Sequence, residues 1–205
     1  MADSERLSAL REALARHVQS QRALGIAPPA LSLSETRRLA AQVGCSPADA
    51  ELAALEAHIL PERYRRNLGT IGWEGQARLL RATVAIVGAG GLGGWIIEGL
   101  ARMGVGRLIV IDGDTFQENN LNRQLGCTER ALGRPKAECL AERAAEVNSA
   151  VRVSPYALWL DERNAAELLA GADVIVDALD TLPARAVLAR AAAALGAPLV
   201  HGAIG

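Results

Sequence analysis

The sequence predicts an α/β protein built on a doubly wound, mostly parallel sheet, with a small N-terminal helical domain. From Thr83 onward, short apolar runs bounded by turn residues alternate with helical segments. This order favours parallel strands joined by right-handed crossovers. The 205 residues are 50% hydrophobic and only 3% aromatic, as expected when aliphatic helices pack on both faces of a buried sheet.

Residues 1–60 are expected to form the helical domain, and residues 61–205 the α/β domain. A first helix is indicated by apolar residues at helical spacing: Leu7, Leu10, Leu14 and Val18. A second helix should begin near Ser34. A third should begin at Ser46-Pro47, because serine is a favoured N-cap and proline suits the first turn. This third helix is predicted to end at Pro61 and to carry Leu52, Leu55 and Ile59 on one side.

The order of helix, Gly44 turn and helix within residues 1–60 has the form of a DNA-binding helix-turn-helix. The second helix of that pair, however, offers Asp49, Glu51 and Glu56, and residues 46–60 contain no Lys or Arg. Phosphate groups would be repelled by such a helix, and the net charge of the chain is only −1. A packing or docking role is therefore favoured, and nucleic acid is not expected as a partner.

The α/β region is expected to contain five strands and four helices. The strands are predicted at 83–87, 108–111, 151–153, 174–178 and 198–200. The helices are predicted at 92–103, 135–147, 162–169 and 183–195. Ligands of such sheets bind at the carboxyl ends of the strands.

Location and cysteine chemistry are constrained by what the sequence contains. It shows no apolar run of the ~18 to 20 residues that a membrane helix needs, and an acidic start replaces the basic segment of a secretory signal. We expect a cytoplasmic protein. Cys45, Cys127 and Cys139 form no CxxC pair, so we expect reduced thiols and no zinc site in this chain, with Cys127 a packing thiol rather than a nucleophile.

A glycine loop follows the first predicted strand, with glycine at positions 88, 90, 91 and 93. Gly88, Gly90, Gly91 and Gly93 would let the backbone approach a ligand closely and aim helix N-terminal amides at anionic oxygens. Asp112 ends the second strand, where a carboxylate can accept hydrogen bonds from ribose hydroxyls. These features indicate a Rossmann-like nucleotide-binding domain, and a nicotinamide or flavin enzyme would fit them equally well.

Arg123, Lys136 and Asp180 separate these possibilities. Lys136 is the single lysine among 22 Lys and Arg residues. A triphosphate carries more charge than a dinucleotide and typically needs cationic clamps and a metal, and Asp180 could hold Mg²⁺ directly or through water. Taken singly, Arg123 and Lys136 could be a solvated surface pair and Asp180 a helix N-cap. Together with the glycine loop they predict a site for ATP and Mg²⁺.

The chain resembles the ThiF/MoeB/HesA family, bacterial relatives of the ubiquitin-activating enzymes, from Arg63 to its end. The motifs that carry the resemblance occur in family order: residues 63–67 (RYRRN), 88–93 (GAGGLG), 112–114 (DGD), 120–124 (NLNRQ), 133–136 (GRPK) and 177–180 (DALD). So many motifs at the right spacing are far more specific than a glycine loop alone.

The resemblance implies an adenylyltransferase that uses ATP and Mg²⁺ to activate the C-terminal glycine of a ubiquitin-like sulfur-carrier protein ending in Gly-Gly. Such carriers serve thiamin and molybdopterin-type cofactor biosynthesis. It also implies a homodimer. The residues implied for the nucleotide site beside the glycine loop are Asp112 for the ribose, Asn120, Arg123 and Lys136 for the phosphates, Asp180 for magnesium, Asp114 and Gln124 as further contacts, and Arg66 reaching into the partner subunit's site.

Two departures from the family pattern qualify these expectations. Asn67 stands where the family usually has glutamine, and family members normally continue well beyond the fifth strand. We therefore expect a fragment or a reduced member that self-associates or needs a partner.

Three other functions are compatible with parts of this sequence. The same ATP site could activate a carboxylate on a modified tRNA nucleoside. The chain could be a non-catalytic scaffold half of such an enzyme, although scaffold halves usually lose the phosphate-binding residues that this chain keeps. A nicotinamide oxidoreductase is the fold-level rival, disfavoured by Arg123, Lys136 and Asp180.

Overall fold

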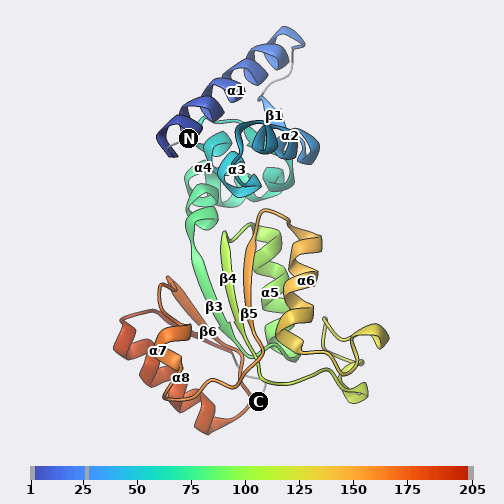
Figure 1. Ribbon diagram of the computed structural model, residues 1–205, viewed down its shortest axis with the longest axis vertical. Helices are drawn as coiled ribbons and strands as arrows, with labels where there is room; N and C mark the ends of the chain where they lie inside the picture. Colours follow the sequence, from blue (N-terminus) through green and yellow to red (C-terminus); the bar gives the residue numbers. More distant parts are fainter. Residues whose placement is uncertain (1–2, 26–27, 203–205) are drawn as a thin grey trace. The chain divides into compact units, whose positions relative to one another are not determined.

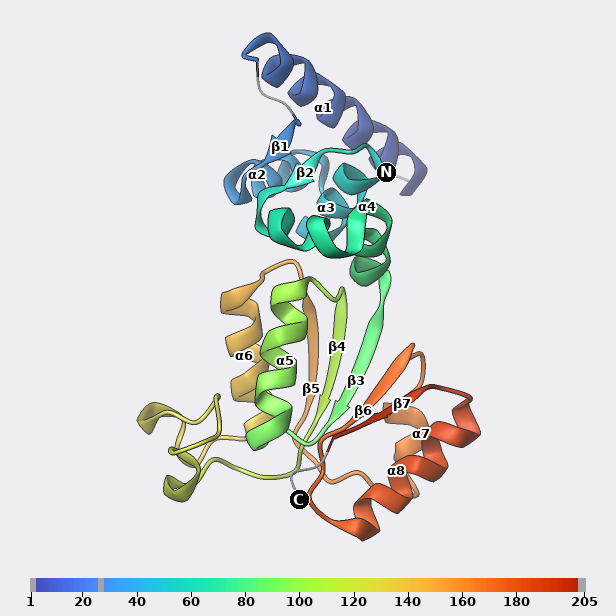
Figure 2. The same ribbon diagram turned by 180° about the vertical axis from the view of Figure 1, so that it is seen from behind.

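The computed structural model describes residues 3–25 and 28–202, and the chain divides between Leu80 and Arg81 into two compact units. The first unit is mainly helical, and the second contains a five-stranded parallel sheet flanked by helices (Figures 1 and 2). No helix among the described residues has both the length and the apolar character needed to cross a membrane.

The first unit consists of four helices and one short pair of parallel strands. The helices are α1 (Asp3–Ala23), α2 (Leu33–Val43), α3 (Pro47–Glu56) and α4 (Arg65–Arg81), and β1 (Ala30–Leu31) pairs with β2 (Leu60–Pro61), which leads into the 3-10 turn η1 (Glu62–Tyr64). The described core of α1 to α3 is formed by buried aliphatic residues that include Leu10, Leu14, Leu31, Leu39, Val43, Ala50, Ala54 and Ile59.

Side-chain caps explain where α2 and α3 begin. Ser32 and Glu35 form a capping box at the start of α2, and Ser46 and Asp49 form another at the start of α3. In each case the N-cap hydroxyl accepts a hydrogen bond from a backbone N–H that has no partner within the helix. The predicted starts of both helices are thus confirmed.

The predicted end of the third helix is wrong. Helix α3 stops at Glu56, and the next residues turn sharply, because His58 adopts a positive φ of 55°. The Ile59 amide donates to the Ala54 carbonyl over 2.8 Å and closes the turn. Ile59 therefore lies outside the helix, although its buried side chain still packs in the same core.

Glu51, one of the acidic residues of the third helix, is buried in the structure. Its side chain is 1% exposed; it accepts a hydrogen bond from the Tyr64 hydroxyl over 2.9 Å and lies 3.2 Å from Arg63 Nε. Burial raises the pKa of the Glu51 carboxyl, against the opposing effects of Arg63 and Tyr64. Glu51 therefore ties η1 to α3.

Residues 61–80 belong by their contacts to the helical unit. Tyr64, Ala77 and Leu80 form a buried cluster with Leu55 of α3. The sequence assigned this segment to the α/β domain, which was expected to begin at residue 61. The compact unit instead continues through most of α4, which bends at Gly72, where φ is 67° and ψ is −178°.

The second unit confirms the predicted fold class. Its strands are β3 (Thr83–Val87), β4 (Arg107–Ile111), β5 (Arg152–Tyr156), β6 (Val174–Asp177) and β7 (Leu199–His201), all parallel and ordered β5-β4-β3-β6-β7. The first strand in sequence thus lies at the centre and the chain winds outward in both directions. This order creates a switch point beside β3, where the connections leave in opposite directions.

Helices cover both faces of this sheet. The pair α5 (Gly91–Met103) and α6 (Lys136–Val147) covers one face, and α7 (Ala165–Leu168) and α8 (Leu182–Leu195) cover the other (Figures 1 and 2). Because side chains alternate along a strand, each central strand contributes to two cores. One of these, between the sheet and α7 with α8, contains the buried residues Ala85, Val87, Ile109, Ile111, Ile175, Leu169 and Leu188.

Two predicted elements differ in length from the observed ones. Strand β5 continues to Tyr156 and includes Pro155, which is tolerated because β5 is an edge strand that pairs only with β4. Helix α7 is shorter than the predicted 162–169. Asp161 and Asn164 exchange side-chain and backbone hydrogen bonds before it, and this turn delays the helix.

Candidate nucleotide-binding site

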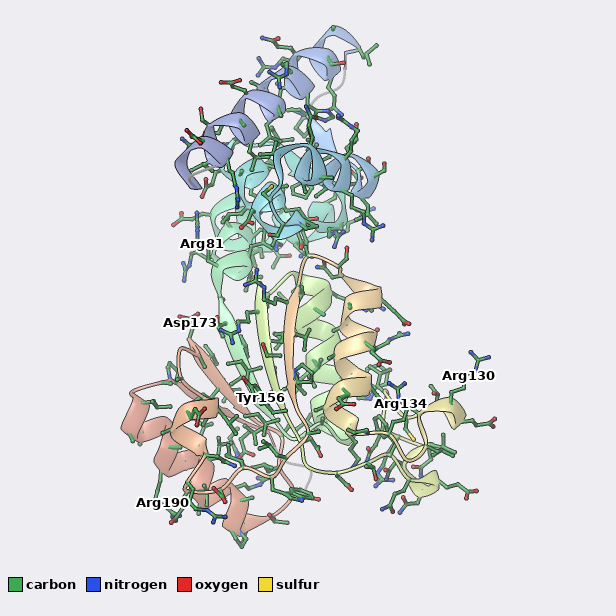
Figure 3. All side chains as sticks on the ribbon, viewed as in Figure 1. Arg81, Arg130, Arg134, Tyr156, Asp173 and Arg190 are labelled. Atoms are coloured by element: carbon green, nitrogen blue, oxygen red, sulfur yellow. The ribbon has the colours of Figure 1, made fainter. Side chains whose placement is uncertain are left out.

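The carboxyl ends of the central strands meet at one edge of the sheet. The backbone ladder continues past the strands there: the Gly88 amide donates to Ile111, Ala178 to Val87, and Asp112 to Tyr156, over 2.9 to 3.1 Å. Tyr156 marks this edge on β5, whereas Asp173 marks the opposite edge before β6 (both labelled in Figure 3). The loops that follow β3, β4 and β6 are therefore held close together.

Two positions of the glycine loop admit no side chain. Gly88 has a φ of 99°, and a Cβ on it would lie 2.5 Å from the Ala178 carbonyl oxygen. A Cβ on Gly93 would lie 1.8 Å from the Gly88 carbonyl oxygen. Both clashes involve backbone, so the loop can hold this tight form only with glycine at these positions.

Gly90 and Gly91 have a different environment. The nearest atoms to a Cβ built on them are Gln124 Nε2 at 3.7 Å and Arg123 Cγ at 3.9 Å. The fold itself would therefore accept a methyl group at either position, which leaves room for a ligand to approach the backbone. Helix α5 begins here, and the amides of its first turn have no carbonyl partner within the helix.

Asp112 connects the glycine loop to the loop after β4. Its Oδ2 accepts a hydrogen bond from the Ala89 amide over 2.6 Å, and its Oδ1 accepts one from the Asp114 amide over 2.8 Å. Burial raises the pKa of Asp112, outweighing these two hydrogen bonds and the nearby Lys136 charge. Each carboxylate oxygen keeps a second lone pair, so the group can still accept from a hydroxyl.

Lys136 forms the best-defined ion pair of this region. Its Nζ lies 2.6 Å from Asp114 Oδ2; the lysine side chain is only 7% exposed, and that of Asp114 is 40% exposed. The hydrogen bond from Lys136 lowers the pKa of Asp114. The Thr115 amide donates to Asp114 Oδ1 over 2.9 Å, so the carboxylate is fixed from two sides.

The backbone holds this pair in register. The Lys136 amide donates to the Asp114 carbonyl, and the Phe116 amide donates to the Arg134 carbonyl, each over 3.0 Å. Thr115 and Pro135 form an antiparallel bridge between these bonds. The start of α6 is thereby clipped to the loop after β4. A hydrogen-bonded chain consequently runs from Ala89 through Asp112 and Asp114 to Lys136.

Arg123 and Gln124 lie over the glycine loop, as their distances from Gly90 and Gly91 show. Arg123 is exposed, and its Nη1 donates to Asn119 O over 2.8 Å and to Asn122 Oδ1 over 3.0 Å. Gln124 is buried, and among the side chains that the structure describes its Oε1 is the fully buried polar atom without a hydrogen-bond partner. Such an orphaned acceptor typically marks a missing water or ligand.

Asn120 has a local role in this structure. Its Oδ1 accepts a hydrogen bond from the Gln117 amide over 3.0 Å, and its Nδ2 donates to Asn119 Oδ1 over 3.0 Å. The side chain is buried and shapes the turn that precedes Arg123. One Nδ2 hydrogen is left for another acceptor.

Asp180 follows β6 on a turn that lies against the glycine loop, because the Ala178 carbonyl faces Gly88. The Asp180 side chain is exposed, and within the described part of the chain its carboxylate makes no hydrogen bond or ion pair. No group of three or more His, Cys, Asp or Glu residues suited to a metal occurs among the described residues. A single free carboxylate suits a Mg²⁺ ion whose other ligands are phosphate oxygens and water.

Most of the predicted site residues are thus brought to one edge of the second unit. Arg66 is the exception, since it belongs to the first unit, where it lies exposed on α4. Cys127 is buried, donates to the Gln117 carbonyl over 3.6 Å, and has its pKa raised by burial. This environment agrees with the prediction of a packing thiol.

Sequence reasoning missed two features of this edge. Trp159 is 67% exposed, and its indole lies against Gly113, where a Cβ would come within 2.6 Å of it. Arg185 was not singled out, yet it contacts His201, which in turn contacts Asp177. The position of Trp159 shortly after the end of β5 was the available signal, whereas the position of Arg185 on helix α8 gave none.

The parallel sheet with helices on both faces and the glycine loop after β3 define a protein of the Rossmann-like α/β class. The sequence model of the ThiF family matches residues 64–205. The chain belongs to the ThiF family.

Two curated relatives and one solved structure illustrate the similarity. The SAMP-activating enzyme E1 of Haloferax volcanii and the sulfur carrier protein adenylyltransferase of Thermus thermophilus are each 44% identical over 145 residues, covering 70% of this chain and 54% of the relative. The tRNA N6-threonylcarbamoyladenosine dehydratase TcdA of E. coli, solved in complex with ATP, has a TM-score of 0.67 at 30% identity, covering 70% of this chain and 62% of that chain. The chain thus spans about half the length of these curated relatives.

Proposed function

We propose that this chain binds ATP and adenylates the C-terminal glycine of a ubiquitin-like sulfur-carrier protein that ends in Gly-Gly. The observation that carries the proposal is the buried Lys136 ammonium, joined through Asp114 and Asp112 to the glycine loop. A buried cation beside free helix amides is suited to a polyphosphate. The names of the 44% identical relatives support the activity and the kind of acceptor.

The chemistry requires no nucleophilic side chain. A carboxylate oxygen of the carrier's terminal glycine attacks the α-phosphorus of ATP and forms a C–O–P bond. The bond from the α-phosphorus to the bridging oxygen breaks, and pyrophosphate leaves with the electron pair. Both reactants are anionic, so catalysis must come from charge neutralisation and orientation.

Different residues at the carboxyl edge of the sheet bind different parts of ATP in this proposal. In the proposal Asp112 accepts from the ribose hydroxyls, and Arg123 with Lys136 binds the phosphates of ATP. Asn120 keeps one amide hydrogen for a phosphate oxygen, and Gln124 points its Nε2 toward the glycine loop. Loss of one such contact typically costs about 2 to 4 kcal/mol of transition-state stabilisation.

Magnesium would be held by Asp180 together with the phosphates, and when bound it would neutralise charge on the leaving pyrophosphate. Asp180 suits this role because its carboxylate is exposed, without a partner in the described residues, and located on the turn against Gly88. We further propose a homodimer in which the exposed Arg66 of one subunit completes the site of the other.

Carrier-dependent exchange of labelled pyrophosphate into ATP tests the proposal. We expect exchange that needs a protein ending in Gly-Gly and is lost in Lys136→Ala. Arg134→Ala is the matched control, since Arg134 is two residues away, is exposed, and pairs with Glu142 at the surface over 2.5 Å (Figure 3). ATP binding without any exchange would support the scaffold alternative, and a chain that binds no ATP would refute the proposal.

A second acceptor follows from the similarity to TcdA, whose name identifies a tRNA-modifying enzyme. The same site would then activate a carboxylate on a modified tRNA nucleoside. Adding tRNA in place of the carrier to the exchange reaction distinguishes the two acceptors. Exchange that depends on tRNA and ignores the carrier would favour this alternative.

A further inference from the structure

A cluster of three charged or ionisable side chains links the ends of β6, β7 and the start of α8. Asp177 and His201 are register partners at the ends of their strands. His201 Nδ1 lies 2.7 Å from Asp177 Oδ2, and the aspartate is 2% exposed. On the other side of the ring, Arg185 Nη1 of α8 lies 2.9 Å from His201 Nε2.

The hydrogen-bond directions in this cluster follow from its chemistry. A guanidinium has only donors, so His201 Nε2 must accept from Arg185. The ring proton therefore resides on Nδ1, which donates to Asp177. His201 therefore bridges the buried Asp177 carboxylate and Arg185, because one ring nitrogen donates a hydrogen bond and the other accepts one.

Arg185 uses its second Nη group to hold the turn after β6. Its Nη2 donates to the Leu179 carbonyl and, over 3.4 Å, to the Gly202 carbonyl. The Leu179 amide donates to Asp177 Oδ1 over 3.0 Å. Both backbone polar groups of Leu179 are therefore fixed by the same cluster, one directly by Asp177 and one through His201 and Arg185.

Leu179 lies between Ala178, which contacts the glycine loop, and Asp180, the proposed magnesium ligand. The Ala178 carbonyl oxygen lies 2.5 Å from the position that a Cβ on Gly88 would take, and Asp180 lies two residues further along the chain. A shift of this turn would move Asp180 relative to the glycine loop. Asp180 has no other partner among the described residues that could restore its position.

We infer that His201 is a positioning residue that acts through Arg185 to hold the Ala178–Asp180 turn against the glycine loop, so that Asp180 meets the magnesium of a bound nucleotide. The inference rests on the proposed function for its ligand, and on the hydrogen bonds of Leu179 for its mechanism. Neither His201 nor Arg185 touches the reacting atoms in this account.

The test compares binding of a non-hydrolysable ATP analogue with magnesium and in EDTA, by calorimetry on the full chain. In the wild-type protein, we expect magnesium to tighten binding. His201→Ala and Arg185→Lys should each reduce this gain by about tenfold, as a displaced ligand group does, and should leave the affinity in EDTA unchanged. Asp180→Asn should lose the gain and show no further loss when combined with His201→Ala.

Two further variants separate positioning from a merely structural effect. His201→Asn keeps a donor at the position of Nδ1 for Asp177, and its shorter side chain leaves no acceptor at the position of Nε2, so it should resemble His201→Ala. Full recovery of the magnesium gain in this variant would overturn the link through His201 Nε2 and Arg185. Arg190→Lys is the matched control, because Arg190 lies on the same helix and pairs with Glu162 over 2.7 Å at the surface (Figure 3). It should behave like the wild type.

Hydrogen exchange supplies a readout that needs no nucleotide. The amides of residues 178–182 should exchange faster in His201→Ala and Arg185→Lys than in the wild type or Arg190→Lys, whereas unchanged exchange would overturn the inference. A wild-type chain that binds no ATP analogue would refute the proposed function. Hydrogen exchange would then still decide whether Asp177, His201 and Arg185 hold the Ala178–Asp180 turn. If magnesium tightens analogue binding by His201→Ala as much as by the wild type, the link from His201 to Asp180 is refuted, while the proposed function stands.

Discussion

Lys136 Nζ lies 2.6 Å from Asp114 Oδ2, and the ammonium is far more buried than the carboxylate that accompanies it. An ion pair with one exposed member can exchange its exposed partner for a ligand of the same charge, whereas the buried cation must always have a counter-charge. In this chain the single lysine is therefore placed to bind either Asp114 or the phosphates of a nucleotide. The hydrogen bond to Asp114 occupies one of the three Lys136 donors.

Replacing Asp114 by Asn tests this relationship. We expect Asp114→Asn to lower the free energy of unfolding by about 1 to 3 kcal/mol, because the buried ammonium loses its counter-charge while water still reaches the site. ATP should then raise the melting temperature of the variant more than that of the wild type, since its phosphates replace the lost charge. Thermal denaturation with and without nucleotide measures both effects.

The control for this variant is Glu142→Gln, which removes a carboxylate from the nearby surface pair with Arg134. Exposed pairs contribute little, so its melting temperature and its response to ATP should match the wild type. An Asp114→Asn variant that gains no more from ATP than the wild type would contradict a phosphate role for Lys136.

The same pair predicts a dependence of stability on pH. The pKa of Asp114 is lowered in the folded chain from an ordinary value of 3.8, first by the hydrogen bond from Lys136. The contribution of the ionised Asp114 to the free energy of unfolding is therefore fully present above the ordinary pKa, and it is lost as the pH falls through the lowered pKa of the folded state. We expect wild type and Asp114→Asn to differ in urea unfolding at pH 6, and this difference should shrink as the pH falls below 3.8. A difference that grows on acidification would contradict this assignment.

Burial of Glu51 predicts the opposite sign in the helical unit. Its pKa is raised from 4.5, mainly by burial, so the folded state binds a proton more readily than the unfolded state. The cost of the buried charge is present above the raised value and is relieved as the pH falls through it. Glu51→Gln should remove this contribution, so that its stability relative to the wild type is greatest at neutral pH and declines toward pH 4. Urea unfolding across this range measures it, and a pH-independent difference would count against the shift.

The glycine loop predicts two different outcomes for similar substitutions. Gly93→Ala places a methyl group 1.8 Å from a backbone carbonyl oxygen, and we expect it to destabilise the chain by about 2 to 4 kcal/mol. Gly90→Ala meets its nearest atom at 3.7 Å and should leave the melting temperature almost unchanged while weakening ATP binding. Differential scanning fluorimetry and calorimetric titration separate the two effects. Equal destabilisation by both changes would show that the loop does not have this form.

Complementation between subunits tests the proposed role of Arg66. In a homodimer whose sites combine Lys136 of one subunit with Arg66 of the other, both Lys136→Ala and Arg66→Ala chains are inactive alone. An equal mixture after subunit exchange should recover about one quarter of wild-type pyrophosphate exchange, because half of the dimers are mixed and each contains one intact site. An inactive mixture of chains that demonstrably form mixed dimers would place Arg66 in its own subunit's site.

The central strands β3, β4 and β6 were predictable because each is a short, mostly apolar run that is buried on both faces. The glycine positions were predictable for a similar reason, since Gly88 and Gly93 meet backbone atoms in the structure. The end of α3 and the start of α7 were not predictable from the sequence, because local turns replace helix there. His58 adopts a positive φ after α3, and Asp161 and Asn164 form a hydrogen-bonded turn before α7.

The sequence by itself determined the fold class, the order of strands and helices along the chain, and most of the residues that meet at the carboxyl edge, because these follow from apolar periodicity and from motifs at the ends of predicted strands. Only the tertiary structure decided which charges are paired. Lys136 and Asp114 are 22 residues apart, and His201 reaches Asp177 across 24 residues. Pairing over such separations depends on strand register and burial, which no local pattern encodes.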